Sequence, residues 1–352
     1  MRATIQSVVE TVAGGARRGI VLVLMALTVL AATVVAAPGA DAHATGGQQA
    51  TDWRSRVLNV TGGSDVVSAR SVDLGNRVTI SVAPGHDVVV LGYDGEPYLR
   101  IGPRGVDENV RAPSSYLNRS STAPTSIPAR YDARATPEWV HRSDGRSWHW
   151  HDHRAHHTKG QAANTLWAIP IVIDGRPASI TGETVHVAPA VPWLPIAVLV
   201  IAGALALVVD GPTRAIALLV AIAAAAVLIG VGILGFGSEG AGTRASAIVY
   251  TAIAAIATGA GAVWTARRPR AWSPVLLVAG TVAIVAAGFT FLSWLTHSQL
   301  PTAMPRPLAQ VLVAFVLGAG AGAVVTGALH LAEGTPRAAG TSPRSGAAGS
   351  ST

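Results

Sequence analysis

The stretch of sequence that decides the fold spans residues 215–236 and reads AIALLVAIAAAAVLIGVGILGF. It contains no Asp, Glu, Lys or Arg. As an α-helix it is long enough to cross the ~30 Å apolar layer of a bilayer, and in lipid a helix satisfies its own backbone hydrogen bonds. These residues therefore predict a transmembrane helix.

Similar apolar stretches surround this one. Hydrophobic residues make up 50% of the 352 residues and charged residues only 13%, against about a quarter in a typical globular domain. Five apolar stretches within residues 192–332 predict a bundle of five transmembrane helices, so the lipid bilayer is the first predicted partner. Their predicted bounds are 194–209, 215–236, 247–266, 274–295 and 308–332.

The net charge of +7 predicts how this bundle is oriented. Acidic and basic residues nearly cancel within 43–191, so the excess of arginine flanks the apolar stretches. Arg214 and Arg268 belong to the groups that the positive-inside rule places in the cytoplasm. Residues 43–191 are then extracytoplasmic, and the Gly- and Ser-rich residues 333–352 form a disordered cytoplasmic tail. Because the charge follows the membrane topology, nucleic acid is not a predicted partner.

Residues 1–42 have the composition of a signal peptide or an N-terminal anchor. Arg17 and Arg18 precede an apolar run, and the small-residue sequence Ala40-Asp41-Ala42 follows it, which is typical of a cleaved secretory signal. The apolar run is also long enough to cross a bilayer and remain as an anchor. Both interpretations stay open.

Between this segment and the bundle, residues 43–191 change to short β-rich runs. Asp94-Gly95 and Asp174-Gly175 each lie between two such runs and predict hairpin turns. Residues 102–146 are rich in Pro, Ser, Arg and Asn and predict long loops. The predicted architecture is a β-sandwich-like domain of about seven short strands, which has no disulfides because the chain has no cysteine.

A histidine cluster is the strongest candidate site. Residues 148–157 read WHWHDHRAHH, and neutral imidazole suits zinc and copper. A strand would put alternate histidines on one face, whereas a helix would gather those three or four positions apart. The alternatives are a structural His, Asp and Arg network with the tryptophans packed inward, and a pH-sensitive surface. The predicted metal ligands are His149, His151, His153, His156 and His157.

A further candidate ligand is His43. Cleavage after Ala42 would make it the first residue, where its amino group and imidazole can chelate copper together. This start, His43-Ala44 ahead of a β-rich domain, is similar to that of the periplasmic copper-binding CopC family, and the resemblance implies a copper site. The chain departs from that pattern because none of its three methionines lies within 43–191. Cleavage after Ala44 would also remove His43.

Several motifs of the β domain carry a second resemblance. They are Gly92–Gly105, Tyr116–Arg119, Ser143–Gly145 and Trp150–Arg154. With their order ahead of several apolar helices, they resemble an uncharacterised family of actinobacterial membrane proteins. The resemblance implies the topology and supplies no activity. The charged residues predicted to form one buried ion-pair network are Asp94, Arg100, Arg104, Arg119, Asp144, Asp152 and Arg154. The alternative is that their arginines form a pocket for an anionic ligand.

These observations predict a non-enzymatic protein. The apolar stretches contain no Asp, Glu, Lys or Arg, the residues that usually mark ion pathways, and His330 lies near the end of its stretch. The chain also lacks the Gly-x-Ser-x-Gly, His-Glu-x-x-His and phosphate-loop motifs. We expect an integral membrane protein whose exported β domain binds a ligand or a metal, either copper or zinc. The alternative is a structural or assembly protein of the cell envelope whose exported domain docks a partner protein.

Overall fold

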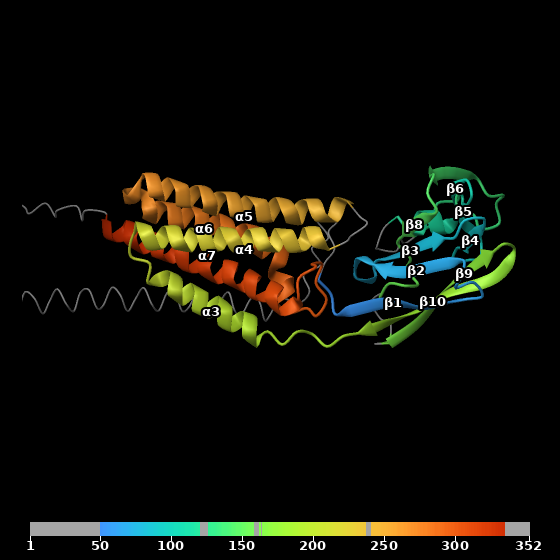
Figure 1. Cartoon of the computed structure of the whole chain (residues 1–352), viewed down its shortest axis with the longest axis horizontal. Coiled ribbons are helices and arrows are strands. Elements are labelled where there is room, and N and C mark those ends of the chain that lie inside the picture. The colour runs from blue at the N-terminus through green and yellow to red at the C-terminus, as the bar shows by residue number, and fades with distance from the viewer. Residues whose placement is uncertain (1–49, 120–125, 158–161, 163, 237–240, 335–352) are drawn as a thin grey trace, which may run out of the picture.

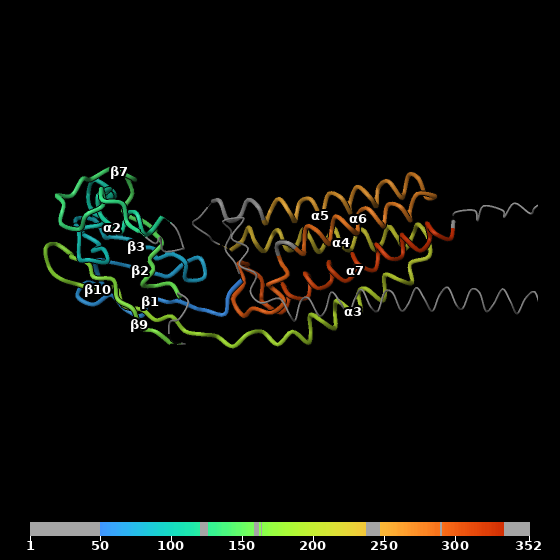
Figure 2. The backbone as a smooth tube through the Cα atoms, turned by 180° about the vertical axis from the view of Figure 1, so that it is seen from behind, coloured from blue at the N-terminus to red at the C-terminus, as the bar shows by residue number. Residues whose placement is uncertain are grey.

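The chain forms two parts that follow one another in sequence, an antiparallel β domain and a bundle of long helices (Figure 1). The computed structural model describes residues 50–119, 126–157, 162, 164–236 and 241–334. The predicted signal or anchor, 1–42, and His43 lie outside the described residues, as do all but the first two residues of the predicted tail. Figure 2 shows from behind that the two parts lie end to end.

The β domain contains a seven-stranded and a three-stranded antiparallel sheet. The larger sheet has the spatial order β1 (Trp53–Thr61), β10 (Arg176–His186), β9 (Asn164–Ile173), β4 (Val88–Leu91), β5 (Pro97–Gly102), β6 (Gly105–Asn109) and β7 (Trp139–Ser143). The smaller sheet has the order β2 (Val67–Val72), β3 (Arg77–Val82) and β8 (Ser147–Trp150). The domain thus has more strands than the seven or so predicted.

One hydrophobic core joins the two sheets. Ile80 of β3 and Ile169 of β9 are both fully buried and belong to the same cluster of side chains. Along β9 every second side chain from Trp167 to Ile173 is buried, which is the period expected of a strand with one face on a core. The two sheets therefore enclose one core between them, as in a β-sandwich.

Both predicted hairpins are confirmed. Strands β9 and β10 pair from Ile173 and Arg176 onward, and the two turn residues Asp174 and Gly175 have φ angles of +48° and +78°. Positive φ at both central positions matches the twist of the flanking strands, and Asp-Gly tolerates it. Gly95 takes a φ of +79° in the turn between β4 and β5.

The prediction of long loops over residues 102–146 was wrong in part. This region contains β6, β7 and the short helix α2 (Pro113–Leu117). Gly105, at a φ of +98°, allows a tight turn from β5 into β6. Strand β6 reads GVDEN and has no alternating hydrophobic pattern. Its charged side chains instead form cross-strand pairs, such as Asp107 with Arg100 at 2.6 Å.

Within the described residues the helical part has five α-helices, of which four are long and apolar enough to cross a membrane. The helices are α3 (Trp193–Leu207), α4 (Pro212–Gly235), α5 (Ala241–Arg267), α6 (Trp272–Phe291) and α7 (Arg306–Gly334), with short turns η2 (Pro269–Ala271) and η3 (Leu292–Leu295). The predicted span 194–209 corresponds to α3, which has 15 residues. A helix of that length covers only about 22 Å, so the structure confirms four of the five predicted spans.

Small residues let the helices approach closely around α7. A Cβ atom at Gly318 or Gly322 would collide with the backbone of α3, and one at Gly320 would lie 3.3 Å from the carbonyl oxygen of Gly280 in α6. Thr326 of α7 also donates its hydroxyl to the carbonyl of Ala206 in α3 at 2.9 Å. Close backbone contact and such hydrogen bonds are the usual means of helix association in lipid.

Two segments attach the β domain to the bundle. Thr51 and Gln299 exchange backbone hydrogen bonds of 2.9 and 2.8 Å, and the amide of Ser298 donates to Asp52 Oδ1 at 2.7 Å. Farther along the chain, the amide of Ala190 donates to the carbonyl of Thr296 at 3.0 Å. The end of the bundle that contains η3 therefore faces the domain.

The direction in which the chain runs through each helix determines at which end of the bundle Arg214 and Arg268 lie. Helix α4 returns toward the domain, since Phe236 at its end lines a cavity with residues of β1. Arg214 at the start of α4 and Arg268 between α5 and α6 consequently lie at the opposite end of the bundle. The two groups predicted to share one side of the membrane thus share one end of the bundle.

Candidate functional site

The histidine-rich segment starts in β8 and leaves the sheet after Trp150. Strand β8 pairs with β3, and Trp150 is 4% exposed in the domain core. The chain then turns, with the amide of Ala155 donating to the carbonyl of Asp152 at 3.1 Å. The strand considered for residues 148–153 therefore ends at Trp150, and both His151 and Asp152 are buried.

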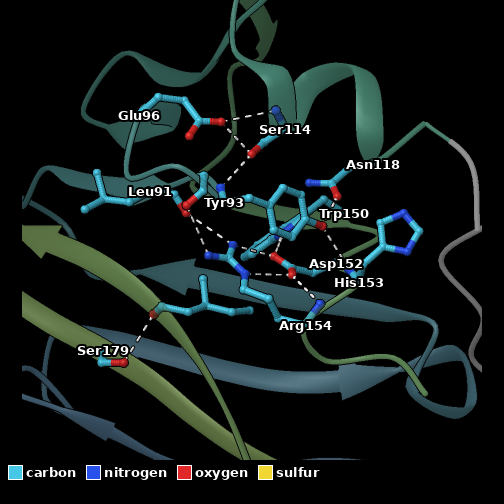
Figure 3. A network of polar contacts seen from close by, with 12 residues as sticks. Leu91, Tyr93, Glu96, Ser114, Asn118, Trp150, Asp152, His153, Arg154 and Ser179 are labelled. Atoms are coloured by element: carbon cyan, nitrogen blue, oxygen red, sulfur yellow. Dashed lines mark hydrogen bonds and ion pairs between the residues drawn. The ribbon is translucent and has the colours of Figure 1, made fainter. Parts of the chain in front are cut away.

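A buried ion pair holds this turn (Figure 3). Arg154 donates from Nε to Asp152 Oδ1 at 2.9 Å and from Nη2 to Oδ2 at 2.8 Å, the two-pronged geometry of strong arginine–carboxylate pairs. The Asp152 side chain has no exposed surface, and that of Arg154 is 18% exposed. Trp150 donates its indole N–H to the same carboxylate at 2.9 Å. Both carboxylate oxygens therefore accept hydrogen bonds.

The same guanidinium joins the turn to β4. Arg154 donates to the backbone carbonyls of Leu91 at 3.2 Å and Gly92 at 3.3 Å. Its Cζ lies 4.8 Å from the centre of the Tyr93 ring, a cation–π contact. Burial lowers the pKa of Arg154, but the Asp152 carboxylate outweighs it and holds that pKa above its ordinary value. The ion pair is therefore also a link between two parts of the domain.

Tyr93 extends the network to α2. Its hydroxyl donates to Asn118 Oδ1 and accepts the backbone N–H of His153 at 2.9 Å, while its own amide donates to Ser114 Oγ at 3.0 Å. Ser114 in turn donates to the buried carboxylate of Glu96 at 2.7 Å. Burial raises the pKa of the Tyr93 hydroxyl well above its ordinary value, so this group remains a hydrogen-bond donor at neutral pH.

Of the charged residues predicted to form one buried network, the structure pairs Arg154 with Asp152. Arg100 instead pairs with Asp107 between β5 and β6, and the Asp144 side chain is fully exposed. The sequence identifies the charged residues of the loops but not which arginine enters the core, because that depends on contacts between distant segments.

Three histidine rings gather beside this network. The ring centres of His151 and His153 are 4.6 Å apart, and those of His151 and His156 are 5.3 Å apart. Two imidazoles bound to one metal at about 2.0–2.1 Å and a near-tetrahedral angle place their ring centres about 5 Å apart. Among the residues that the structure describes, no group of three or more His, Cys, Asp or Glu side chains is arranged to hold a metal ion.

The first two of these rings each have one engaged nitrogen and one free nitrogen. His151 Nδ1 lies 2.6 Å from the carbonyl oxygen of Asn76, and His153 Nε2 lies 3.1 Å from that of Leu117. Because a carbonyl only accepts hydrogen bonds, these nitrogens carry the ring protons. The opposite atoms, His151 Nε2 and His153 Nδ1, are buried without a hydrogen-bond partner. Each therefore presents an unused lone pair.

Burial favours the neutral form of two of these rings. It is the largest of the effects, which include neighbouring imidazoles, that lower the pKa of His151 to about 4 and that of His156 to about 4. Neutral imidazole is the form that binds metal ions. At neutral pH His151 and His156 can therefore offer lone pairs without first losing a proton.

The other predicted ligands lie outside this cluster. His157 stacks on Trp53 with ring centres 3.4 Å apart, and His149 lies against Trp148 with ring centres 5.9 Å apart. Sequence reasoning also missed the backbone carbonyls of Asn76 and Leu117, for which a single sequence contains no signal. The structure thus brings three of the five candidate ligands together as neighbouring rings, and metal binding by any of them stays a prediction.

Four long apolar helices beside an antiparallel β domain are the features of a multi-pass membrane protein. Comparisons with protein-family models, with curated proteins and with solved structures give no match.

Proposed function

We propose that this protein holds its β domain outside the cytoplasm on transmembrane helices and binds zinc or copper in that domain through His151, His153 and His156. The observation that carries the proposal is the pair of free, buried nitrogens on His151 and His153. Each belongs to a ring whose other N–H is bound to a backbone carbonyl. Metal-ligating histidines almost always have such a second hydrogen bond, which orients the ring and fixes its tautomer.

Energetics favour a ligand at these nitrogens. A buried polar atom without a partner costs free energy, and native structures contain few of them. A metal ion bound by His151 Nε2 and His153 Nδ1 would offset that cost. The ring of His156, whose centre lies 5.3 Å from that of His151, is the further ligand that we propose.

The buried ion pair supports this site. The Asp152–Arg154 pair lies within the turn that carries His151 and His153, and Tyr93 accepts the amide of His153. These contacts fix the backbone from which the rings project. The network is thus the scaffold of the proposed site rather than a part of it.

Charge supports the proposed orientation. Arg214 and Arg268 lie at the bundle end away from the domain, and basic residues concentrate on the cytoplasmic side of membrane proteins. The chain must also reach that end before α4 begins, so we propose that α3 is the fifth crossing. Local thinning of the bilayer accommodates a helix shorter than the apolar layer.

Metal binding is tested by equilibrium dialysis of the full chain in detergent, purified without a histidine tag, against Zn²⁺ or, under reductant, Cu⁺. We expect one ion per chain. The double variant His151→Ala/His153→Ala should lose it, whereas the matched control His86→Ala/His141→Ala, which removes two histidines outside the cluster, should keep it. No stoichiometric binding, or equal loss in both variants, contradicts the proposal.

Orientation is tested by cysteine labelling, since the chain has no cysteine of its own. A membrane-impermeant maleimide applied to intact cells should label Ser64→Cys in the β domain and leave Thr213→Cys at the far end of α4 unlabelled. The reverse pattern would place the domain in the cytoplasm.

The alternative function remains a prediction. Docking of an envelope partner through residues 148–157 has less support, because Trp150 and Asp152 are buried. Co-purification of a partner after gentle detergent extraction, lost in a surface variant that still binds metal, would favour it. The resemblances to the actinobacterial family and to CopC proteins also remain predictions.

A further inference from the structure

A cavity of about 300 Å³ lies where the β domain meets the helical bundle. Trp53 and Ser55 of β1 and Asp73 of the short turn η1 (Asp73–Gly75) line it from the domain. Phe236, which follows α4, and Gln299, which follows η3, line it from the bundle. The cavity therefore lies at the level where the helices end, apart from the histidine cluster.

Three side chains that line this cavity have unmet hydrogen-bonding capacity. Ser55 Oγ, Ser71 Oγ and Asp73 Oδ1 are buried and have no hydrogen-bond partner. The Asp73 side chain is only 2% exposed, and Arg77 Nε lies 3.7 Å from its other oxygen, Oδ2. That distance is longer than the 2.7–2.9 Å of a charge-assisted hydrogen bond. Oδ1 of this buried carboxylate can therefore accept a hydrogen bond from a further cation or strong donor.

The backbone holds this carboxylate in place. Asp73, Leu74 and Gly75 have φ angles of +56°, +57° and +91°, a left-handed run that is unfavourable for the two residues with side chains. A Cβ atom at Gly75 would lie 2.7 Å from Ser55 Cβ, so the turn is pressed against β1. Backbone of this kind persists only where the surrounding structure enforces it, often at ligand sites.

We infer that this cavity binds the ammonium group of a phosphatidylethanolamine headgroup, with Asp73 as its counter-ion. A primary ammonium has three N–H donors and no acceptor, which matches three oxygen atoms that lack donors. Arg54, which is exposed and also lines the cavity, provides a cation for the adjoining phosphate. Trp53 and Phe236 supply aromatic surface of the kind that favours the headgroup layer.

The position of the cavity selects a lipid over a free amine. Its bundle-side walls belong to the ends of α4 and η3, and the ends of membrane-crossing helices lie in the headgroup layer. The inference thus rests on the membrane-crossing helices and requires no metal at the histidines. Lipid and metal binding are measured separately, so failure of one proposal is distinguishable from failure of the other.

Native mass spectrometry of the delipidated full chain in detergent tests the inference. With short-chain phosphatidylethanolamine we expect one bound lipid, held on the order of tenfold more tightly than phosphatidylcholine, whose methylated nitrogen has no N–H donors. Asp73→Asn should lower the affinity for phosphatidylethanolamine to the phosphatidylcholine value. The matched control Asp65→Asn, at an exposed carboxylate of the same domain, should retain full affinity.

Three results would overturn the inference. They are equal binding of the two lipids, undiminished binding by Asp73→Asn, and displacement of the lipid by free ethanolamine at equal concentration. If Asp73→Asn does not fold, Ser71→Ala takes its place, with a severalfold loss of phosphatidylethanolamine affinity expected and an unchanged affinity contradicting the inference.

Discussion

Two adjacent parts of one turn differ in how completely their polar atoms are paired. Both oxygens of the buried Asp152 accept hydrogen bonds, from Arg154 and from the Trp150 indole. One residue away on either side, His151 and His153 each keep a buried ring nitrogen without a partner. A fully paired buried network stabilises a fold, whereas an unpaired buried atom reduces stability. The contrast separates scaffold from candidate binding site.

The contrast also explains why both occur in one turn. A ligand site needs side chains whose positions are held by other groups. The Asp152–Arg154 pair attaches the turn to the carbonyls of Leu91 and Gly92, so His151 and His153 can keep unused lone pairs at fixed positions. Four changes to the chain or to the pH test this division, in order of decreasing expected effect.

The largest effect is expected from Asp152→Ala. The change leaves the Arg154 charge buried without its partner, so the free energy of unfolding should fall by about 3–5 kcal/mol. Urea denaturation of the full chain in detergent, followed by near-UV circular dichroism, measures it. Asp144→Ala, at an exposed carboxylate, should change stability by less than about 1 kcal/mol. A comparable loss of stability in both variants would contradict the role of the Asp152–Arg154 ion pair as the scaffold of the turn.

Acidification should act on the histidine cluster next. Burial, with smaller effects from His153 and Arg77, holds the pKa of His151 at about 4, below the ordinary value of about 6.5. Its contribution to stability is therefore complete above pH 6.5 and is lost as pH falls toward 4, by about 3 kcal/mol. Urea midpoints of the metal-free chain between pH 7 and 4 measure this loss. Burial lowers the pKa of His156 to about 4 as well, so His151→Phe should reduce the dependence without abolishing it. An unchanged slope would contradict the buried neutral His151 ring.

Tyr93→Phe should have a smaller effect. It removes the hydroxyl that bonds Asn118 and the amide of His153, which leaves two polar groups unpaired and costs about 1–3 kcal/mol. The same denaturation assay applies, with Tyr116→Phe as the control. If the His153 backbone depends on this hydroxyl, metal affinity should fall as well. If the variant is destabilised but keeps full metal affinity, the Tyr93 hydroxyl stabilises the fold without positioning the metal ligands.

The smallest effect is expected at His141, on the surface. Hydrogen bonds to Asp107 and Asp144 raise its pKa above the ordinary value, opposite to the buried rings. Its small contribution to stability is therefore present below pH 6.5 and lost as pH rises through the raised pKa. An NMR titration of the ring should show the shift, which Asp107→Asn should reduce. A value at or below 6.5 would show that the surface pairing does not persist in solution.

Local sequence patterns predict a considerable part of this molecule. The Asp174-Gly175 turn was predicted because its φ requirements are set by two adjacent residues. Strands β6 and β7 were missed, since polar edge strands depend on cross-strand partners such as Arg100 and Asp107. The length of α3 was overestimated because Val208 and Val209 are apolar but lie outside the helix. Periodicity and composition are thus reliable only where the residue's own neighbours decide its structure.

The β-rich part, the run of long apolar helices and the histidine-rich segment can all be predicted from the sequence, since each follows from composition, hydrophobicity and turn chemistry over a few residues. The contacts of Asn76 and Leu117 with His151 and His153, and the place of Asp73 in a cavity shared with the bundle, become visible only in the folded chain. Hydrophobic burial is specified residue by residue, whereas the pairing of a buried polar atom depends on which distant segment the fold brings within hydrogen-bond distance.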